Sequence, residues 1–116
     1  MHHQALLHRS LSLEPAEPLW RRAPARDTDG GPLSDFMMII PELRDQPVLR
    51  QRRTVDRIQQ VLAAYAPVVV FADLNLKLNV LWVTVRPRPG ICAELPAAIF
   101  ACVPEARLVA YQPHRR

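Results

Sequence analysis

Apolar residues recur along the second half of the chain in patterns that predict short strands and helices. The run 36–40 is wholly apolar and is followed by Pro41, which predicts a buried strand. Residues 42–47 lack such a pattern and read as a loop. Residues 47–65 predict an amphipathic helix that Pro67 ends, because apolar side chains recur there at steps of three, four and seven: Val48, Val55, Ile58, Leu62 and Tyr65. Pro47 suits the first position of this helix.

Residues 68–86 are apolar over most of their length and are too many for one strand of the usual five or six residues. We therefore predict two strands, over 68–73 and 80–87. The turn between them falls within 74–79, where Asn75 and Asn79 tolerate a positive φ. This segment predicts a β-hairpin.

A second helix and a last strand follow the hairpin. Apolar side chains at Leu95, Ile99 and 102–103 share one face of a helix over 91–103. Pro96 is tolerated only in a first turn, so we expect this helix to begin near residue 94 or 95. Residues 107–112 then predict the final strand.

The predicted order is strand, helix, strand, strand, helix, strand. This order is that of the ferredoxin-like fold, a two-layer α+β sandwich of βαββαβ connectivity. Right-handed crossovers place the first and third strands in the middle, which gives an antiparallel sheet of order 4-1-3-2 with both helices on one face. We assign residues 35–113 to this domain and residues 114–116 to a short tail.

Residues 1–34 differ from the rest of the chain. They are rich in proline and glycine, show no sustained period and balance acidic against basic side chains. Such a segment buries too little apolar surface to offset its chain entropy, so we predict a disordered or loosely attached extension. No apolar run suits a signal peptide or a membrane span, and we expect a soluble, cytoplasmic protein that does not contact membranes.

The predicted strands are apolar on both faces, although helices cover only one face in this fold. An uncovered apolar sheet surface usually marks an interface. We expect a second copy of the domain to cover it as a two-fold dimer, with Phe71 and Trp82 in the contact. The alternative is that the N-terminal extension folds over this face, with Leu19 and Trp20 as the plug.

The net charge is +4, and all but one of the 15 cationic side chains are arginine. A basic surface is predicted on the first helix, at Arg50, Arg52, Arg53 and Arg57. The turn containing Arg86, Arg88 and Gly90 leads into the second helix, where guanidinium groups and free N–H groups would suit an anion. Arginine, alanine and proline are abundant together, which is the composition that GC-rich codon usage produces. The arginines therefore need no special function, and we expect ordinary solvated surfaces and consider nucleic acid an unlikely partner.

Residues with the usual catalytic chemistry are sparse. Histidine occurs only at positions 2, 3, 8 and 114, which leaves the predicted domain interior without a His base. Cys92 and Cys102 form no CxxC pair, although Cys92 lies near a helix start, where the pKa of a thiol can fall. We identify no cofactor motif and no metal site. We therefore expect a protein that is not an enzyme.

Three functions remain open from the sequence. The first is a non-catalytic module that acts through protein–protein contacts and self-association. The second is a regulatory domain that senses a small ligand at a dimer interface. The third is a weak binder of nucleic acid or other anions through its arginine-rich surface. Fold alone does not choose among them.

Overall fold

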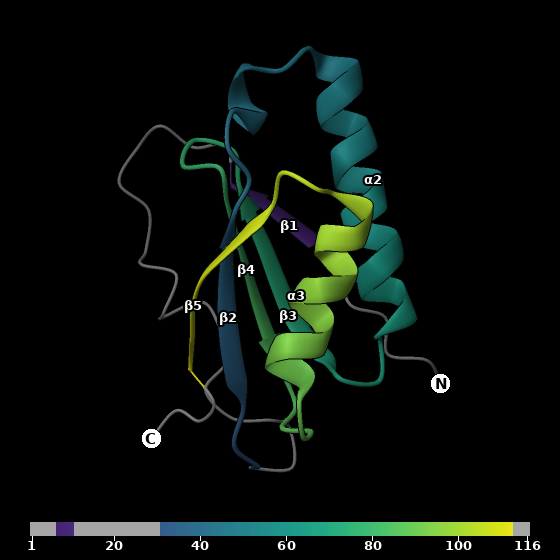
Figure 1. The fold of residues 1–116 in the computed structure, drawn as a ribbon, viewed down its shortest axis with the longest axis vertical. Helices are drawn as coiled ribbons and strands as arrows, with labels where there is room; N and C mark the ends of the chain where they lie inside the picture. Colours follow the sequence, from purple (N-terminus) through teal and green to yellow (C-terminus); the bar gives the residue numbers. More distant parts are fainter. Residues whose placement is uncertain (1–6, 11–30, 113–116) are drawn as a thin grey trace.

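A computed structural model of the chain describes residues 7–10 and 31–112. Its strands and helices follow one another along the chain as in Figure 1. They are β1 (Leu7–Ser10), β2 (Ser34–Ile39), the 3₁₀ turn η1 (Leu43–Asp45), α2 (Val48–Ala64), β3 (Val69–Asn75), β4 (Val80–Val85), α3 (Ile91–Cys102) and β5 (Arg107–Gln112).

The protein is a small α+β fold built on one sheet, whose strands lie in the order β1-β3-β4-β2-β5. Numbered from β2, the four antiparallel strands lie in the order 2-3-1-4. The whole sheet differs from the predicted four-strand order 4-1-3-2, because β1 adds a fifth strand parallel to β3. Residues 7–10 lie in the predicted extension, where the sequence indicated no regular structure. The rest of that extension, with Leu19 and Trp20, falls outside the described residues, except for 31–34.

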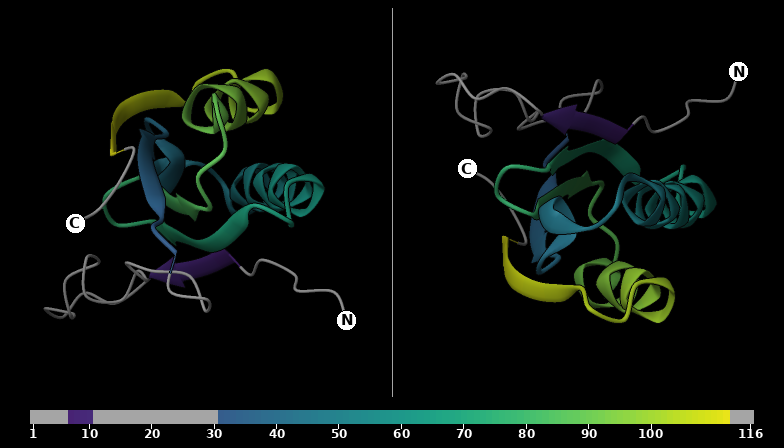
Figure 2. Two further views of the ribbon diagram at one scale, coloured as in Figure 1. Left: turned by 90° about the horizontal axis from the view of Figure 1, so that it is seen from below. Right: turned by 90° about the horizontal axis from the view of Figure 1, so that it is seen from above.

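Both helices cover the same face of the sheet, as the two end views in Figure 2 show. The core between the layers takes side chains from β2, η1, α2, β3, β4, α3 and the connection that follows α3. Its largest fully buried members include Phe36, Met38, Ile58, Leu62, Leu81, Leu95 and Ile99. Burial of such side chains contributes roughly 1.5–3 kcal/mol each. The apolar periods of the sequence therefore gather in this one core.

The opposite face of the sheet is less apolar than the sequence predicted. Asp35, Asp73 and Thr84 lie on it and are buried, between half-buried apolar side chains. A register shift separates Val69, which pairs with Val85 on the helix-covered side, from Phe71, which pairs with Thr84. Regular alternation would place residues 69 and 71 on one face, but they lie on opposite faces because a bulge inserts one extra residue between them.

The helix ends also differ from the predicted ones. Pro47 is the N-cap of α2, one position before the helix begins, and it makes no side-chain cap. Helix α3 begins at Ile91 with Gly90 as its N-cap, so Pro96 lies in its interior and not in its first turn. Of the C-terminal residues expected on the apolar face, Val103 is buried and Cys102 is exposed.

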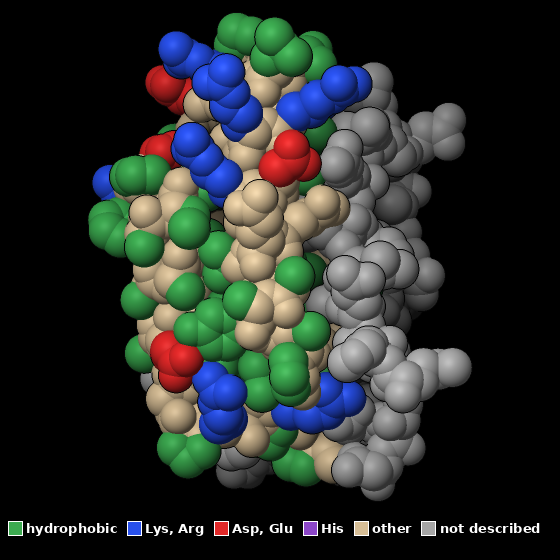
Figure 3. Space-filling model, turned by 90° about the vertical axis from the view of Figure 1, so that its right-hand side faces the viewer, with side chains coloured by type: hydrophobic (Ala, Val, Ile, Leu, Met, Phe, Trp, Pro, Cys, Tyr) green, Lys and Arg blue, Asp and Glu red, His purple; other side chains and the backbone are tan. Residues whose placement is uncertain are grey.

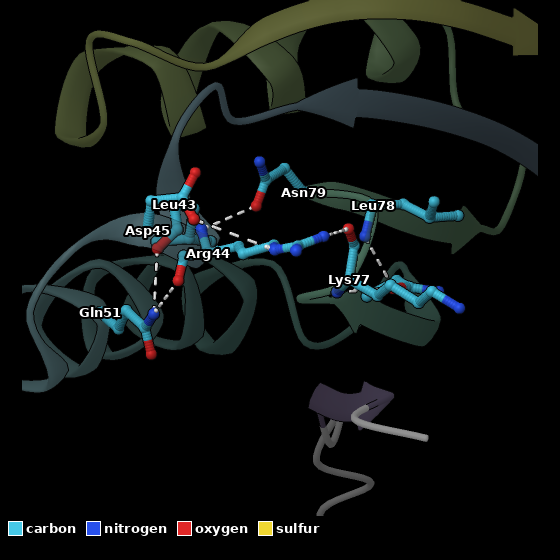
Figure 4. A network of polar contacts seen from close by, with 8 residues as sticks. Leu43, Arg44, Asp45, Gln51, Lys77, Leu78 and Asn79 are labelled. Atoms are coloured by element: carbon cyan, nitrogen blue, oxygen red, sulfur yellow. Dashed lines mark hydrogen bonds and ion pairs between the residues drawn. The ribbon is translucent and has the colours of Figure 1, made fainter. Parts of the chain in front are cut away.

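A polar network connects the β3–β4 turn to η1 and to the start of α2 (Figure 4). The turn spans residues 76–79, within the predicted interval, and Asn79 adopts a positive φ of 58°. Its Oδ1 accepts a hydrogen bond of 2.8 Å from the backbone N–H of Arg44. The Gln51 side chain of α2 donates to the carbonyls of Leu43 and Arg44. These bonds hold η1 between the turn and the helix.

Replacing Asn79 should separate the contribution of its side chain from that of its backbone conformation. Asn79→Gly keeps the left-handed conformation but loses the bond to Arg44, so we expect a loss of about 1 kcal/mol. Asn79→Ala loses the bond and keeps a Cβ at positive φ without the polar side chain that lets asparagine adopt this conformation, for a loss of about 2 kcal/mol. Urea unfolding of both variants measures the difference. Equal losses would show that backbone strain at residue 79 has no effect.

Candidate anion-binding groove

A hollow of about 410 Å³ lies beside the N-terminal half of α2. We call it the arginine groove. Its wall combines one face of α2 with the loop around η1 and the connection from α3 to β5, and its lining residues are Pro41, Glu42, Gln46, Arg50, Arg53, Thr54, Arg57 and Glu105. Two consecutive segments of the chain and one distant connection therefore form one concave site.

The helical repeat explains which arginines reach the groove. Arg50, Arg53 and Arg57 are spaced by three and then four residues, which places them on one face of a helix. Arg52 is exposed on the same helix but does not line the groove. The sequence prediction grouped all four as one basic surface; the structure brings three of them together and separates the fourth.

The three guanidinium groups of the groove form no ion pair within the part of the chain that the structure describes. Glu42 and Glu105 line the same hollow without pairing with them. Figure 3, which shows this side of the molecule, has Lys and Arg side chains gathered at the end where α2 begins. The groove therefore holds positive charge that no described carboxylate neutralises at contact distance.

The position of Arg50 is unfavourable for the helix itself. The N-terminus of a helix carries a partial positive charge, so acidic side chains stabilise the first turn and basic ones destabilise it. Helix α2 has no acidic residue in its first turn, no basic residue in its last turn and no side-chain N-cap. The first turn instead contains Arg50, and its terminal N–H groups have no side-chain acceptor. An anion at this end would offset both deficits.

Two further features of the groove are unusual. Thr54 is only 6% exposed, and its hydroxyl forms no hydrogen bond among the described residues. Glu42 adopts a left-handed conformation with φ of 65°, which a residue with a Cβ rarely adopts. Such departures from local preference are more frequent at binding sites than elsewhere.

The second predicted anion site is occupied by the protein's own groups. Arg88 Nη2 lies 3.1 Å from Oε2 of Glu94, and Arg86 Nη1 donates to the carbonyl of Pro67 at 2.7 Å. Gly90 has a φ of 77° and is the N-cap of α3, so it fills a structural role that favours glycine. The turn brings the two arginines near α3, but both guanidinium groups have partners.

Tyr65 completes this second cluster. Its hydroxyl donates to Oε2 of Glu94 at 2.8 Å, and the guanidinium of Arg88 lies 5.8 Å from its ring centroid. The hydrogen bond to Glu94 raises the pKa of Tyr65 above its usual value near 10, with burial and the negative charge of Glu94 as smaller causes, while Arg88 opposes the shift. The cluster ties the end of α2 to the start of α3.

The two residues predicted for an interface, Phe71 and Trp82, both lie on the sheet face away from the helices and are half-buried. Trp82 Nε1 donates to the hydroxyl of Thr84 at 3.1 Å, and that hydroxyl donates to Oδ1 of Asp35 at 2.7 Å. Phe71 and Trp82 make further interactions in the structure. An interface at this face stays a prediction.

Cys92 has the opposite electrostatic environment to that of a reactive thiol. Burial raises the pKa of its thiol, and the nearby charge of Asp35 raises it further. A raised pKa lowers the thiolate fraction at neutral pH and with it the nucleophilicity. Within the ranges 7–10 and 31–112, no three His, Cys, Asp or Glu side chains are grouped to hold a metal ion.

Sequence reasoning missed four of the groove's features. Glu42 and Glu105 come from loops whose positions depend on the tertiary fold, and nothing in the sequence brings them next to α2. Gln46 directly precedes the N-cap of α2, but no pattern in the sequence marks it as a lining residue. Thr54 is the exception, because it lies between Arg53 and Val55 at the boundary of the apolar face. A polar residue at the boundary between the apolar and the basic face of a helix could have indicated Thr54 as a candidate lining residue.

Comparison with protein-family models, with curated proteins and with solved structures finds no match to this chain. Among the described helices, none is long and apolar enough to cross a membrane.

The pKa of Tyr65 should follow its two charged neighbours in opposite directions. Glu94→Gln removes the charged acceptor and should lower this pKa toward its usual value; Arg88→Gln should raise it further. A Tyr111→Phe background leaves one tyrosine for ultraviolet titration. An unchanged pKa in Glu94→Gln would contradict the bond between Tyr65 and Glu94.

The same shift sets the direction of the pH dependence of stability. A phenol whose pKa is raised by folding stabilises the folded state fully below the unfolded value, near pH 10. That contribution is lost as the pH rises through the higher folded value. Unfolding at neutral and at strongly alkaline pH should therefore show a smaller alkaline loss in Glu94→Gln than in the unchanged protein.

Proposed function

We propose that this protein is a non-catalytic binding module that holds an anionic ligand in the arginine groove. The observation that carries the proposal is the set of three guanidinium groups that line one hollow without an ionic partner among the described residues. Arginine presents a planar fork of donors that matches phosphate and carboxylate groups in pairs of hydrogen bonds. The proposal develops the anion-binding alternative of the sequence and transfers it from the 86–90 turn to α2.

The energetics of α2 support this proposal. The helix is stabilised by its buried apolar face, which includes Val55, Ile58 and Leu62. This stabilisation lets the helix form although the charges on its opposite side are unfavourable. Three cations along one face repel each other, and Arg50 in the first turn also opposes the helix dipole. A bound anion would convert each of these costs into an attraction, so ligand binding should stabilise the folded protein.

Removal of the middle arginine should weaken anion binding. We expect Arg53→Gln to raise the Kd for pyrophosphate about tenfold, the equivalent of one charged hydrogen-bonded contact. Arg52→Gln is the matched control, because it removes the same charge from the same helix outside the groove. Titration calorimetry at low ionic strength measures both, and added salt should weaken binding. An equal increase of Kd in both variants would show that pyrophosphate binds through the general positive charge of the helix and not in the groove.

We also propose that the fold is ferredoxin-like with one strand added. Read from the β5 edge and numbered from β2, the antiparallel strands lie in the order 4-1-3-2, which supports the assignment. The cover of one sheet face by both helices supports it too (Figure 2). The parallel strand β1 is not part of that plan.

Self-association is a second candidate function, and one surface feature favours it. Phe100 of α3 and Leu108 of β5 are 48% and 45% exposed. Arg107 places its guanidinium 5.4 Å from the ring centroid of Phe100, so this part of α3 lies beside the start of β5. A bulge in the β2–β5 pairing opposes direct strand addition at this edge. A dimer here would therefore form through side chains of α3 and β5.

A charge at position 108 should disrupt such a dimer. We expect light scattering to give a dimer mass for the unchanged protein and a monomer mass for Leu108→Lys, because burial of an unpaired charge is unfavourable. Leu49→Lys is the control, since Leu49 is 70% exposed in the first turn of α2 and belongs to neither α3 nor β5. A dimer that survives Leu108→Lys would exclude this contact and leave the face of Phe71 and Trp82.

A further inference from the structure

The arginine groove contains acidic as well as basic groups, and this mixture restricts the ligand. We infer that the ligand is a small organic phosphate that carries hydroxyl or amino groups, and that Glu42 and Glu105 exclude polymeric anions such as nucleic acid. This inference rests on the proposed function and goes further, because it names the ligand class and assigns a selectivity role to the two carboxylates.

The size of the groove supports a small ligand. Its volume of about 410 Å³ lies within the range of roughly 300–1,000 Å³ that is typical of small-molecule sites. Arg50 and Arg57 are seven positions apart, which is about 10 Å along a helix axis. A phosphorylated molecule of several more atoms matches that span.

The carboxylates oppose a long polyanion. Glu42 comes from the loop at η1 and Glu105 from the connection between α3 and β5, so the groove is lined by acidic groups from two loops. A nucleic-acid backbone that passes through the groove would bring successive phosphates against these side chains, and like charges at such distances repel. Surfaces that follow a nucleic-acid backbone are predominantly basic instead.

The same carboxylates can recognise a small ligand. An ionised carboxylate is only an acceptor of hydrogen bonds, so it favours hydroxyl or amino groups. The Thr54 hydroxyl, buried and without a partner among the described residues, adds a donor and an acceptor to the lining. A ligand with a phosphate for the arginines and hydroxyl groups for Glu42, Glu105 and Thr54 would match every one of these chemical groups.

Neutralising one carboxylate should strengthen binding of a nucleic acid and weaken binding of a sugar phosphate. We would titrate full-length protein and its Glu105→Gln variant with glucose 6-phosphate, pyrophosphate and a single-stranded DNA dodecamer, by calorimetry at low ionic strength. Glu105→Gln should bind the dodecamer roughly fivefold more tightly, because one repulsive charge is gone. Glucose 6-phosphate should lose affinity relative to pyrophosphate, which has no donor groups for Glu105. Asp56→Asn, an exposed acid of α2 outside the groove, is the matched control.

The outcomes separate this inference from the proposed function. Anion binding that depends on Arg53, together with no change of selectivity in Glu105→Gln, would overturn the inference and leave the proposed function standing. Tighter binding of the dodecamer than of glucose 6-phosphate by the unchanged protein would overturn it as well. If neither pyrophosphate nor glucose 6-phosphate binds in an Arg53-dependent manner, both proposals fail.

Discussion

The antiparallel pairing of β2 with β4 is the contact on which the rest of the fold depends. It joins residues 34–39 to residues 80–85 in the middle of the sheet. Along the chain, the two paired strands are separated by the whole segment that contains α2 and β3. Each of the two strands leads into a helix, and both helices pack on the same face. Phe36 and Val83 are directly opposite each other in this pairing and are both buried in the core. Because side chains alternate along a strand, a shift of one residue would turn these core positions toward the other face.

The pairing also forms the groove indirectly. Strand β2 ends at Ile39, and the backbone N–H of Ile40 donates to the carbonyl of Asn79 at 2.8 Å. The chain then enters η1, which the Arg44 and Gln51 bonds hold against the turn and the helix (Figure 4). Pro41, Glu42 and Gln46 therefore reach the wall of the groove from a fixed loop. A site on a supported loop presents its groups with less loss of conformational entropy than one on a free loop.

Helix α2 combines two opposed requirements. Its apolar face packs in the core, and its basic face places Arg50 in the first turn, where the helix dipole makes a cation least favourable. The end of α2 is tied to α3 through the Tyr65–Glu94–Arg88 cluster, in which Glu94 pairs with one of the two arginines predicted for an anion site at 86–90. The two arginine sets thus differ in kind. Arg88 is structural because a carboxylate lies beside it, whereas the groove arginines lack one among the described residues.

The periodic patterns predicted most of the regular structure. The amphipathic helix at residues 48–64, the hairpin with its turn before Val80 and the last strand at 107–112 agree with the apolar periods, because burial of one face determines local conformation in each. The start of α3 was wrong, since the rule that keeps proline in a first turn was overridden by packing of Ile91 and Leu95 in the core. The strand at residues 7–10 was missed because a short edge strand obtains its stability from its neighbour β3 and shows little pattern of its own.

The sequence by itself determined which residues are apolar, where helices and strands are favoured, and that four arginines lie on one helix. Tertiary structure decided the rest. Whether an arginine is free or paired depends on which carboxylate the fold brings within contact distance, and Glu94 and Arg88 are close only because α3 begins at Ile91. The groove likewise exists only where η1, α2 and the 103–106 connection meet. Concavity and charge balance arise from contacts between distant segments, and no local pattern of residues encodes them.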